Sequence, residues 1–129
     1  MLILLDTNVL LKLVDTRLGA LPLSVRTAVS DPENILNASV TSLWEIAIKV
    51  RLGKLKLTFA PTLLPETLES TAISLLTIDH RHVLADVVPE PTTNDPFDRL
   101  LLAQCSVESM RLLTLDRALV GHPLAWRSP

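Results

Sequence analysis

Five acidic residues, far apart in the sequence, each stand at the end of a predicted strand or near the start of a predicted helix. They are Asp6, Glu45, Asp95, Asp98 and Asp116. Right-handed crossover connections bring the carboxyl ends of all strands of a parallel sheet to one edge, and ligands of α/β proteins bind at that edge. We therefore expect these carboxylates to converge on one rim of the protein.

A cluster of carboxylates is tolerated when one of them binds a proton or when a cation lies among them. Two unit charges about 4 Å apart repel each other by ~4 kcal/mol at an effective dielectric constant of about 20. An all-oxygen ligand set favours Mg²⁺ or Mn²⁺, and Cys105 and the three histidines form no zinc-binding pattern. Such a metal site suits phosphate chemistry, in which the ion binds phosphate oxygens and lowers the pKa of the attacking water.

Some of these acids also fit a purely structural role. Asp6 and Asp116 can each cap a helix, since aspartate is a favoured N-cap residue. The tetrapeptide 95–98 (DPFD) offers a cap, a proline at the first helical position and an acid at the third. Asp95 therefore fits a helix cap best, whereas Asp98 suits a metal ligand as much as a capping partner.

Glu45 is the acid whose surroundings are most informative. It forms an i,i+4 pair with Lys49, which stabilises a helix modestly. Its neighbours in the sequence are nevertheless apolar: Leu43, Trp44, Ile46, Ala47 and Ile48. A glutamate in such a helix is either a costly buried charge or a metal ligand.

Predicted strands alternate with predicted helices along the chain. We expect strands at 2–5, 35–38, 72–76 and 111–115, a fifth edge strand at 124–126, and helices at 9–14, 23–30, 43–52, within 61–71, and at 79–88, 95–109 and 116–120. This alternation predicts a three-layer α/β/α domain over residues 1–129, with a central, mainly parallel sheet of four or five strands.

Composition bounds the function further. The chain has 129 residues, of which 48% are hydrophobic and 20% charged, and this excludes intrinsic disorder. Aromatic residues make up 3%, so platforms for stacking single-stranded bases are scarce. The net charge is −2, but setting four clustered acids aside from the 14 leaves 10 against 12 basic residues.

Cysteine content and hydropathy indicate the compartment. The single Cys105 excludes an internal disulfide, which fits a reducing environment. The apolar run 2–5 is too short for a signal peptide, and no run approaches the ~20 residues of a membrane span. We expect a soluble, cytoplasmic protein.

Four segments together resemble a known family. LLDTNVLL, SLWEIAIKVRLGKL, DPFDRLLLAQ and LLTLD are similar, in order and spacing, to the four acidic motifs of the PIN domain, and most similar to those of VapC-type toxin ribonucleases of bacterial toxin–antitoxin pairs. The resemblance covers about residues 2–126. It implies a PIN-like fold and a Mg²⁺- or Mn²⁺-dependent endoribonuclease that leaves 5′-phosphate and 3′-hydroxyl ends.

The resemblance also assigns roles to residues. The catalytic and metal-binding tetrad would be Asp6, Glu45, Asp98 and Asp116. Accessory positions would be Asp95, Thr7, Asn8 and Thr114, the last three supporting the acids by hydrogen bonds. If the substrate is RNA, candidate contacts to its backbone are Lys49, Arg51, Lys54, Lys56, Arg99 and Arg117. The basic residues in 49–56 fit a solvated helix end, where they complement the helix dipole, slightly better.

A toxin of this type has a cognate antitoxin protein. Aliphatic residues are abundant in the stretches 10–23 and 52–64, where we expect a groove for an amphipathic antitoxin helix and a homodimer surface. Two other interpretations stay open. One is a phosphatase of the haloacid dehalogenase type, although Asn8 replaces the second Asp of its D-x-D motif. The other is a non-catalytic binding module, against which the four intact acids argue.

Overall fold

The computed structural model describes residues 1–15 and 21–128. Within them, four parallel strands form one sheet in the order β3-β2-β1-β4. The strands are β1 (Leu2–Leu5), β2 (Ile35–Ser39), β3 (Ser74–Leu76) and β4 (Arg111–Leu113). The helices are α1 (Thr7–Val14), α2 (Leu23–Ser30), α3 (Val40–Arg51), α4 (Leu64–Ser70), α5 (His80–Leu84) and α6 (Pro96–Glu108), with a 3₁₀ turn, η2 (Pro61–Leu63), before α4.

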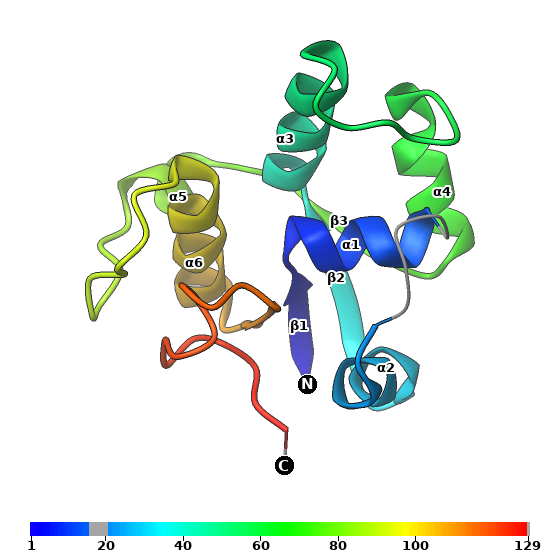
Figure 1. Cartoon of the computed structure of the whole chain (residues 1–129). Coiled ribbons are helices and arrows are strands. Elements are labelled where there is room, and N and C mark those ends of the chain that lie inside the picture. Colours follow the sequence, from blue (N-terminus) through cyan, green and yellow to red (C-terminus); the bar gives the residue numbers. More distant parts are fainter. Residues whose placement is uncertain (16–20, 129) are drawn as a thin grey trace.

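β1 lies at the centre of the sheet, as its unbroken apolar sequence predicts for a strand buried on both faces. Its side chains alternate between the faces. Ile3 and Leu5 pack with α1, α2, α3 and α4, whereas Leu4 packs with α6 on the other face. Figure 1 shows this arrangement, with α5 and α6 on one side of β1 and with α2 and α4 on the other. The predicted three-layer α/β/α architecture is therefore confirmed.

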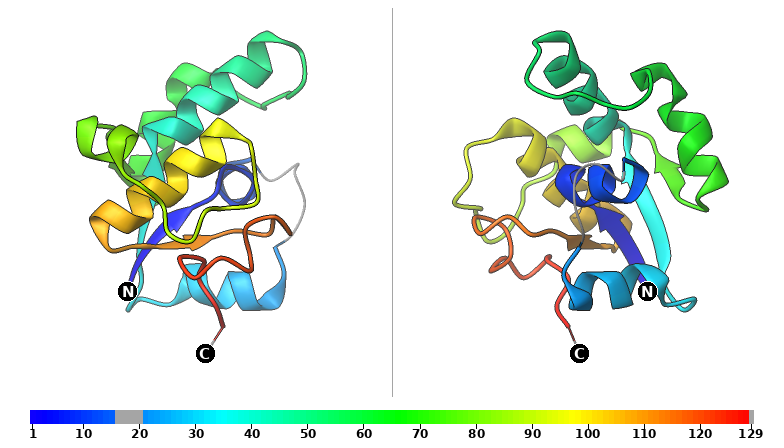
Figure 2. Two further views of the ribbon diagram at one scale, coloured as in Figure 1. Left: turned by 90° about the vertical axis from the view of Figure 1, so that its left-hand side faces the viewer. Right: turned by 45° about the vertical axis from the view of Figure 1, so that its right-hand side comes forward.

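The strands run toward α3, so their carboxyl ends meet at the end of the molecule opposite the two chain termini (Figure 2). α3 follows β2 directly, because Ser39 ends the strand and caps the helix: its Oγ accepts a hydrogen bond from the backbone N–H of Thr41 at 2.9 Å. The helix therefore begins at Val40, three residues before the predicted start. This early start brings Glu45 into the second turn.

Several predicted boundaries were wrong, each for a local reason. The strand predicted from residue 72 begins at Ser74, because Ala72 adopts a left-handed φ of 58° in the turn that closes α4. The helix predicted over 79–88 ends at Leu84, and the chain then extends so that Val87 packs beside α6. The strand predicted over 111–115 ends at Leu113.

The predicted C-terminal elements also differ. Residues 116–120 form turns rather than a helix, and Gly121 and Pro123 follow too soon for the turns to propagate. The predicted fifth strand is a single parallel bridge between Leu112 and Ala125, flanked by two backbone hydrogen bonds of 2.8 Å. Residues 16–20 of the predicted groove stretch lie outside the described residues.

None of the helices within 1–15 and 21–128 is long and apolar enough to cross a membrane.

Candidate active site

Asp6 lies at the carboxyl end of β1, and its carboxylate is held by two neighbours. Oδ1 accepts a hydrogen bond from the backbone N–H of Thr7 at 2.8 Å, and Oδ2 accepts one from the Thr114 hydroxyl at 2.6 Å. β1 pairs with β4, which brings Thr114 alongside. Asp6 is 4% exposed. Burial raises its pKa, the two hydrogen bonds oppose this rise, and the carboxylates of Glu45 and Asp116 add to it.

Glu45 joins the same network through Thr7. The Thr7 hydroxyl donates to Glu45 Oε1 at 2.7 Å, and the Ser42 hydroxyl lies 2.9 Å from the same Thr7 oxygen. Lys49 Nζ lies 2.7 Å from Glu45 Oε2, so both carboxylate oxygens are engaged. Glu45 is 7% exposed. Glu45 therefore forms the helix-stabilising i,i+4 pair with Lys49 and is also linked to Asp6 through Thr7.

α6 contributes the next two acids at its first turn. Asp95 caps the helix, since its Oδ1 accepts from the backbone N–H of Phe97 at 2.8 Å and of Asp98 at 3.5 Å. The Asp98 carboxylate accepts a hydrogen bond from the Thr93 hydroxyl at 3.2 Å. Partial burial and the charge of Asp95 raise the pKa of Asp98 to about 7.

Acids outside α6 also affect the pKa of Asp98. The charges of Asp6 and Asp116 both contribute to its rise. Asp116 is half-buried after β4, and its backbone N–H donates to the Thr114 hydroxyl oxygen at 3.0 Å. That hydroxyl in turn donates to Asp6. Acids from four separate segments therefore influence one another, as the sequence predicts.

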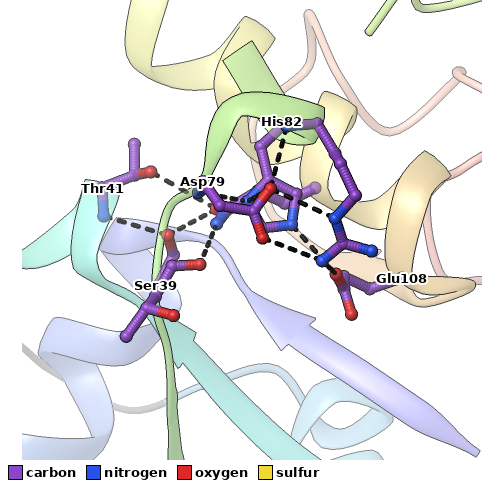
Figure 3. Close-up of polar contacts among 8 residues, drawn as sticks. Ser39, Thr41, Asp79, His82 and Glu108 are labelled. Carbon is purple, nitrogen blue, oxygen red and sulfur yellow. Dashed lines mark hydrogen bonds and ion pairs between the residues drawn. The ribbon is translucent and has the colours of Figure 1, made fainter. Parts of the chain in front are cut away.

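A buried polar network fixes the start of α3, and sequence reasoning missed it. Gln104 of α6 is fully buried; its Oε1 accepts from the hydroxyls of Ser39 and Thr41, and its Nε2 donates to the Thr77 carbonyl at 3.3 Å. Figure 3 shows Ser39 and Thr41 in this network, beside a second polar cluster that includes Asp79, His82 and Glu108. The network holds α3, and with it Glu45, against α6.

Two further supports also escaped sequence reasoning. Ser42 precedes Glu45 by three residues and so shares its helix face, a spacing that could have indicated its position. Thr93 has no sequence signal beyond its place before the DPFD turn. The predicted accessory residue Asn8 is exposed on α1 and lines a cavity of about 300 Å³ with Asp116.

The six predicted RNA contacts are not equivalent. The charge of Lys49 couples to the acids: its hydrogen bond to Glu45 raises its pKa, and the two acids at the start of α6 add to this rise. Arg99 pairs with Glu90. The remaining four are exposed basic side chains: Arg51, Lys54, Lys56 and Arg117.

The acidic rim is formed by Asp6, Glu45, Asp95, Asp98 and Asp116. The donor atoms and the charge of these residues suit a divalent cation. Their donors are carboxylate oxygens. Burial, and to a smaller extent the charges of neighbouring acids, raise the pKa values of Asp6 and Asp98 and so disfavour their ionised forms, which a bound cation would stabilise. Within 1–15 and 21–128, no three His, Cys, Asp or Glu side chains are grouped closely enough to hold an ion by themselves. Mg²⁺ commonly binds through one or two carboxylates and keeps several waters, so it needs no such closed group.

The molecule is thus an α/β/α sandwich with an acidic rim at the carboxyl edge of a parallel sheet. Residues 3–121 match the family model of the PIN domain, and the chain therefore belongs to the PIN domain family. PIN domains are generally metal-dependent nucleases and typically use divalent ions. No curated protein matches the chain. The acidic rim is accordingly the candidate nuclease active site.

Proposed function

We propose that this PIN domain is a Mg²⁺- or Mn²⁺-dependent endoribonuclease and that it acts as the toxin of a toxin–antitoxin pair. One observation carries the nuclease assignment. Asp6 and Glu45, from different elements, are joined through Thr7 and repel each other electrostatically. A fold that holds buried carboxylates together gains most when a cation offsets their charge.

The residues of the acidic rim would have different roles in the reaction. Asp6, Glu45, Asp98 and Asp116 would hold the cation, directly or through water. A bound divalent ion supplies Lewis-acid stabilisation of phosphate oxygens and lowers the pKa of a bound water. Thr7 and Thr114 orient the Asp6 carboxylate, and Thr93 orients that of Asp98. Lys49 supplies a cationic contact beside Glu45 for the anionic RNA backbone.

The alternatives have less support. A haloacid dehalogenase-type phosphatase would carry a second Asp at position 8, where Asn8 is exposed on α1. Family membership favours a nuclease over that phosphatase. No observation specifically favours a non-catalytic binding module.

A cavity beside the acids supports the proposed antitoxin groove. Leu11 and Leu55 line it together with Asp116, so each of the two aliphatic stretches contributes one leucine. Its volume is about 300 Å³, enough to admit apolar side chains of a docked helix. A helix seated there would also cover Asp116. Much of the stretch 52–64 is used in the core, however, since Leu57 and Phe59 pack against it.

The remaining parts of the proposal concern assembly and location. Leu52 and Leu63 are exposed and could contribute to a homodimer surface. Cys105 is free and buried, and burial raises its pKa to about 12, so it is an inert core residue, as expected in a reducing cytoplasm.

The direct test is cleavage of single-stranded RNA with Mn²⁺ and with a chelator. We expect cleavage only with the metal, and its loss in Asp6→Asn. Glu69→Gln, at an exposed position on α4, is the matched control and should cleave normally. Cleavage that persists in the chelator, or in Asp6→Asn, would contradict the proposal.

A further inference from the structure

Trp44 is an exposed aromatic residue in a chain that has few. The sequence contains two Trp, two Phe and no Tyr. Trp126 and Phe59 are partly buried against the core, but Trp44 is 59% exposed. Large aromatic side chains bury more area than most others, so leaving one in water needs an explanation.

The Trp44 ring is held by a second aromatic residue. The ring centroids of Trp44 and Phe97 lie 5.5 Å apart with an interplanar angle of 72°, an edge-to-face contact between α3 and α6. Such pairs are favourable beyond the area that they bury. A contact of this geometry covers at most one face of the indole, and more than half of the Trp44 surface remains exposed. The pair is therefore an oriented aromatic surface.

This surface borders the acidic rim on both helices. Trp44 immediately precedes Glu45, and Phe97 immediately precedes Asp98. Phe97 lies in the first turn of α6, which also carries Asp98. Trp44 contacts it from the second turn of α3, which also carries Glu45, so the aromatic pair joins the two helix turns that bear these acids. Lys49 lies further along α3, with 43% of its side chain exposed for an anionic backbone.

We propose that Trp44, held in place by Phe97, stacks a base of single-stranded RNA beside the cleaved phosphodiester. This inference rests on the ribonuclease function proposed above and names the residue that would hold a base of its substrate. Stacking on an aromatic side chain requires an unstacked base, which a single strand offers and a duplex withholds. The enzyme would therefore prefer single strands, with little base-specific readout at this position, because every base has a π face.

Another use of an exposed Trp would be a contact with a second copy of the chain. The placement favours RNA, because the indole is tied to Phe97 in the helix turn that also carries Asp98, one of the proposed metal-binding acids. The experiment therefore includes the oligomeric state as one of its readouts.

The test uses Trp44 as its own reporter. Trp126→Phe leaves Trp44 as the sole tryptophan, and Asp6→Asn in the same chain prevents cleavage. Titration with an eight-nucleotide oligouridylate should quench Trp44 fluorescence, and a duplex of the same length should not. Anisotropy of labelled RNA should show that Trp44→Ala weakens binding about 5- to 100-fold, the loss expected for one base–aromatic stack. Trp44→Phe should recover most of the affinity.

Leu84→Ala is the matched control, because Leu84 is 78% exposed and lies on α5. It should bind the RNA like the parent. Unchanged Trp44 fluorescence at saturating RNA, or equal affinity in Trp44→Ala, would overturn the stacking site. So would a Trp44→Ala variant whose sedimentation changes while its RNA affinity does not, which would assign the residue to a protein interface. If the chain with Asp6 intact cleaved no RNA yet Trp44 were quenched, ribonuclease activity would fail and the stacking site would stand.

Discussion

The two halves of the acidic rim are held very differently. On the side of α1 and α3, Asp6 and Glu45 are buried, and each of their four carboxylate oxygens has a hydrogen-bond or ion-pair partner within 2.8 Å. On the side of α6, Asp98 is half-buried, accepts one side-chain hydrogen bond at 3.2 Å, and has a pKa raised to about 7.

This difference separates two carboxylates that the protein itself holds in place from one whose ionisation the protein disfavours. The protein itself satisfies Asp6 and Glu45, so their positions are fixed before any ligand arrives. The ionised form of Asp98 is instead disfavoured by partial burial and by the charges of the neighbouring acids, and the one hydrogen bond from Thr93 opposes this only in part. A divalent cation would therefore stabilise the Asp98 side of the rim more than the Asp6 and Glu45 side. The following predictions test this difference between the two sides.

Glu45→Gln should have the largest functional effect. Expression of the chain should arrest growth, and this variant should cancel the arrest, because an amide is a poor ligand for a cation. The fold should persist, since the amide oxygen of the new side chain could still accept from Thr7 and Lys49 is exposed enough to return to water. Growth curves and circular dichroism melting check both parts. A variant that folds and still arrests growth would exclude Glu45 from the chemistry.

The stability of the metal-free protein should fall as the pH rises from about 4 to about 7. Folded Asp98 keeps its proton up to about pH 7, whereas in the unfolded chain it loses the proton near its ordinary pKa of 3.8, so protonation favours the folded state in this interval. Asp98→Asn should remove this part of the pH dependence and stabilise the protein at pH 7.5 by on the order of 1 kcal/mol, allowing for solvent screening. Urea unfolding at several pH values measures it; identical profiles would show that Asp98 is not strained.

Asp95→Ala should cost stability rather than catalysis. Removing a helix cap destabilises a protein by about 1 kcal/mol, and Asp95 caps α6 through Phe97. RNA cleavage should remain within a few-fold of the parent at a temperature where both are folded. Loss of cleavage without a change in melting temperature would show that Asp95 acts as a metal ligand and not only as a helix cap.

Lys49→Met should have the smallest effect, a change in Mn²⁺ affinity whose direction shows what Lys49 does. The Lys49 ammonium neutralises Glu45 in the metal-free protein, so removing it should tighten Mn²⁺ binding by up to about fivefold, the range for a partly exposed ion pair. Weaker Mn²⁺ binding in this variant, measured by calorimetry, would show instead that Lys49 orients Glu45 for the ion.

The sequence predicts the frame of this site well because strong local signals define it. The apolar run before Asp6 predicts a central strand and DPFD predicts the start of a helix, and the structure has both. The family resemblance adds the choice of the four acids, and the match to the PIN domain confirms the family on which that choice rests.

What the sequence hides are contacts between segments distant in the chain. The hydrogen bond from Thr114 to Asp6 spans 108 residues, and the family resemblance alone indicated it; Gln104 meets Ser39 across 65 residues, and nothing indicated that contact. Neither has a periodic signal, because it depends on how β4 and α6 pack against β1 and β2. The aromatic pair escaped for another reason: composition counts few aromatics but says nothing of where two of them meet.

Calorimetric titration of the metal-free protein with Mn²⁺ near pH 7 tests the central claim most directly. The account predicts saturable binding of micromolar to millimolar affinity and proton release as Asp98 ionises. It also predicts a higher melting temperature, because Mn²⁺ at a hundredfold excess over Kd raises the free energy of unfolding by about 2.7 kcal/mol. Asp6→Asn should abolish all three. No heat, together with an unchanged melting temperature in saturating Mn²⁺, would contradict a metal site at this rim.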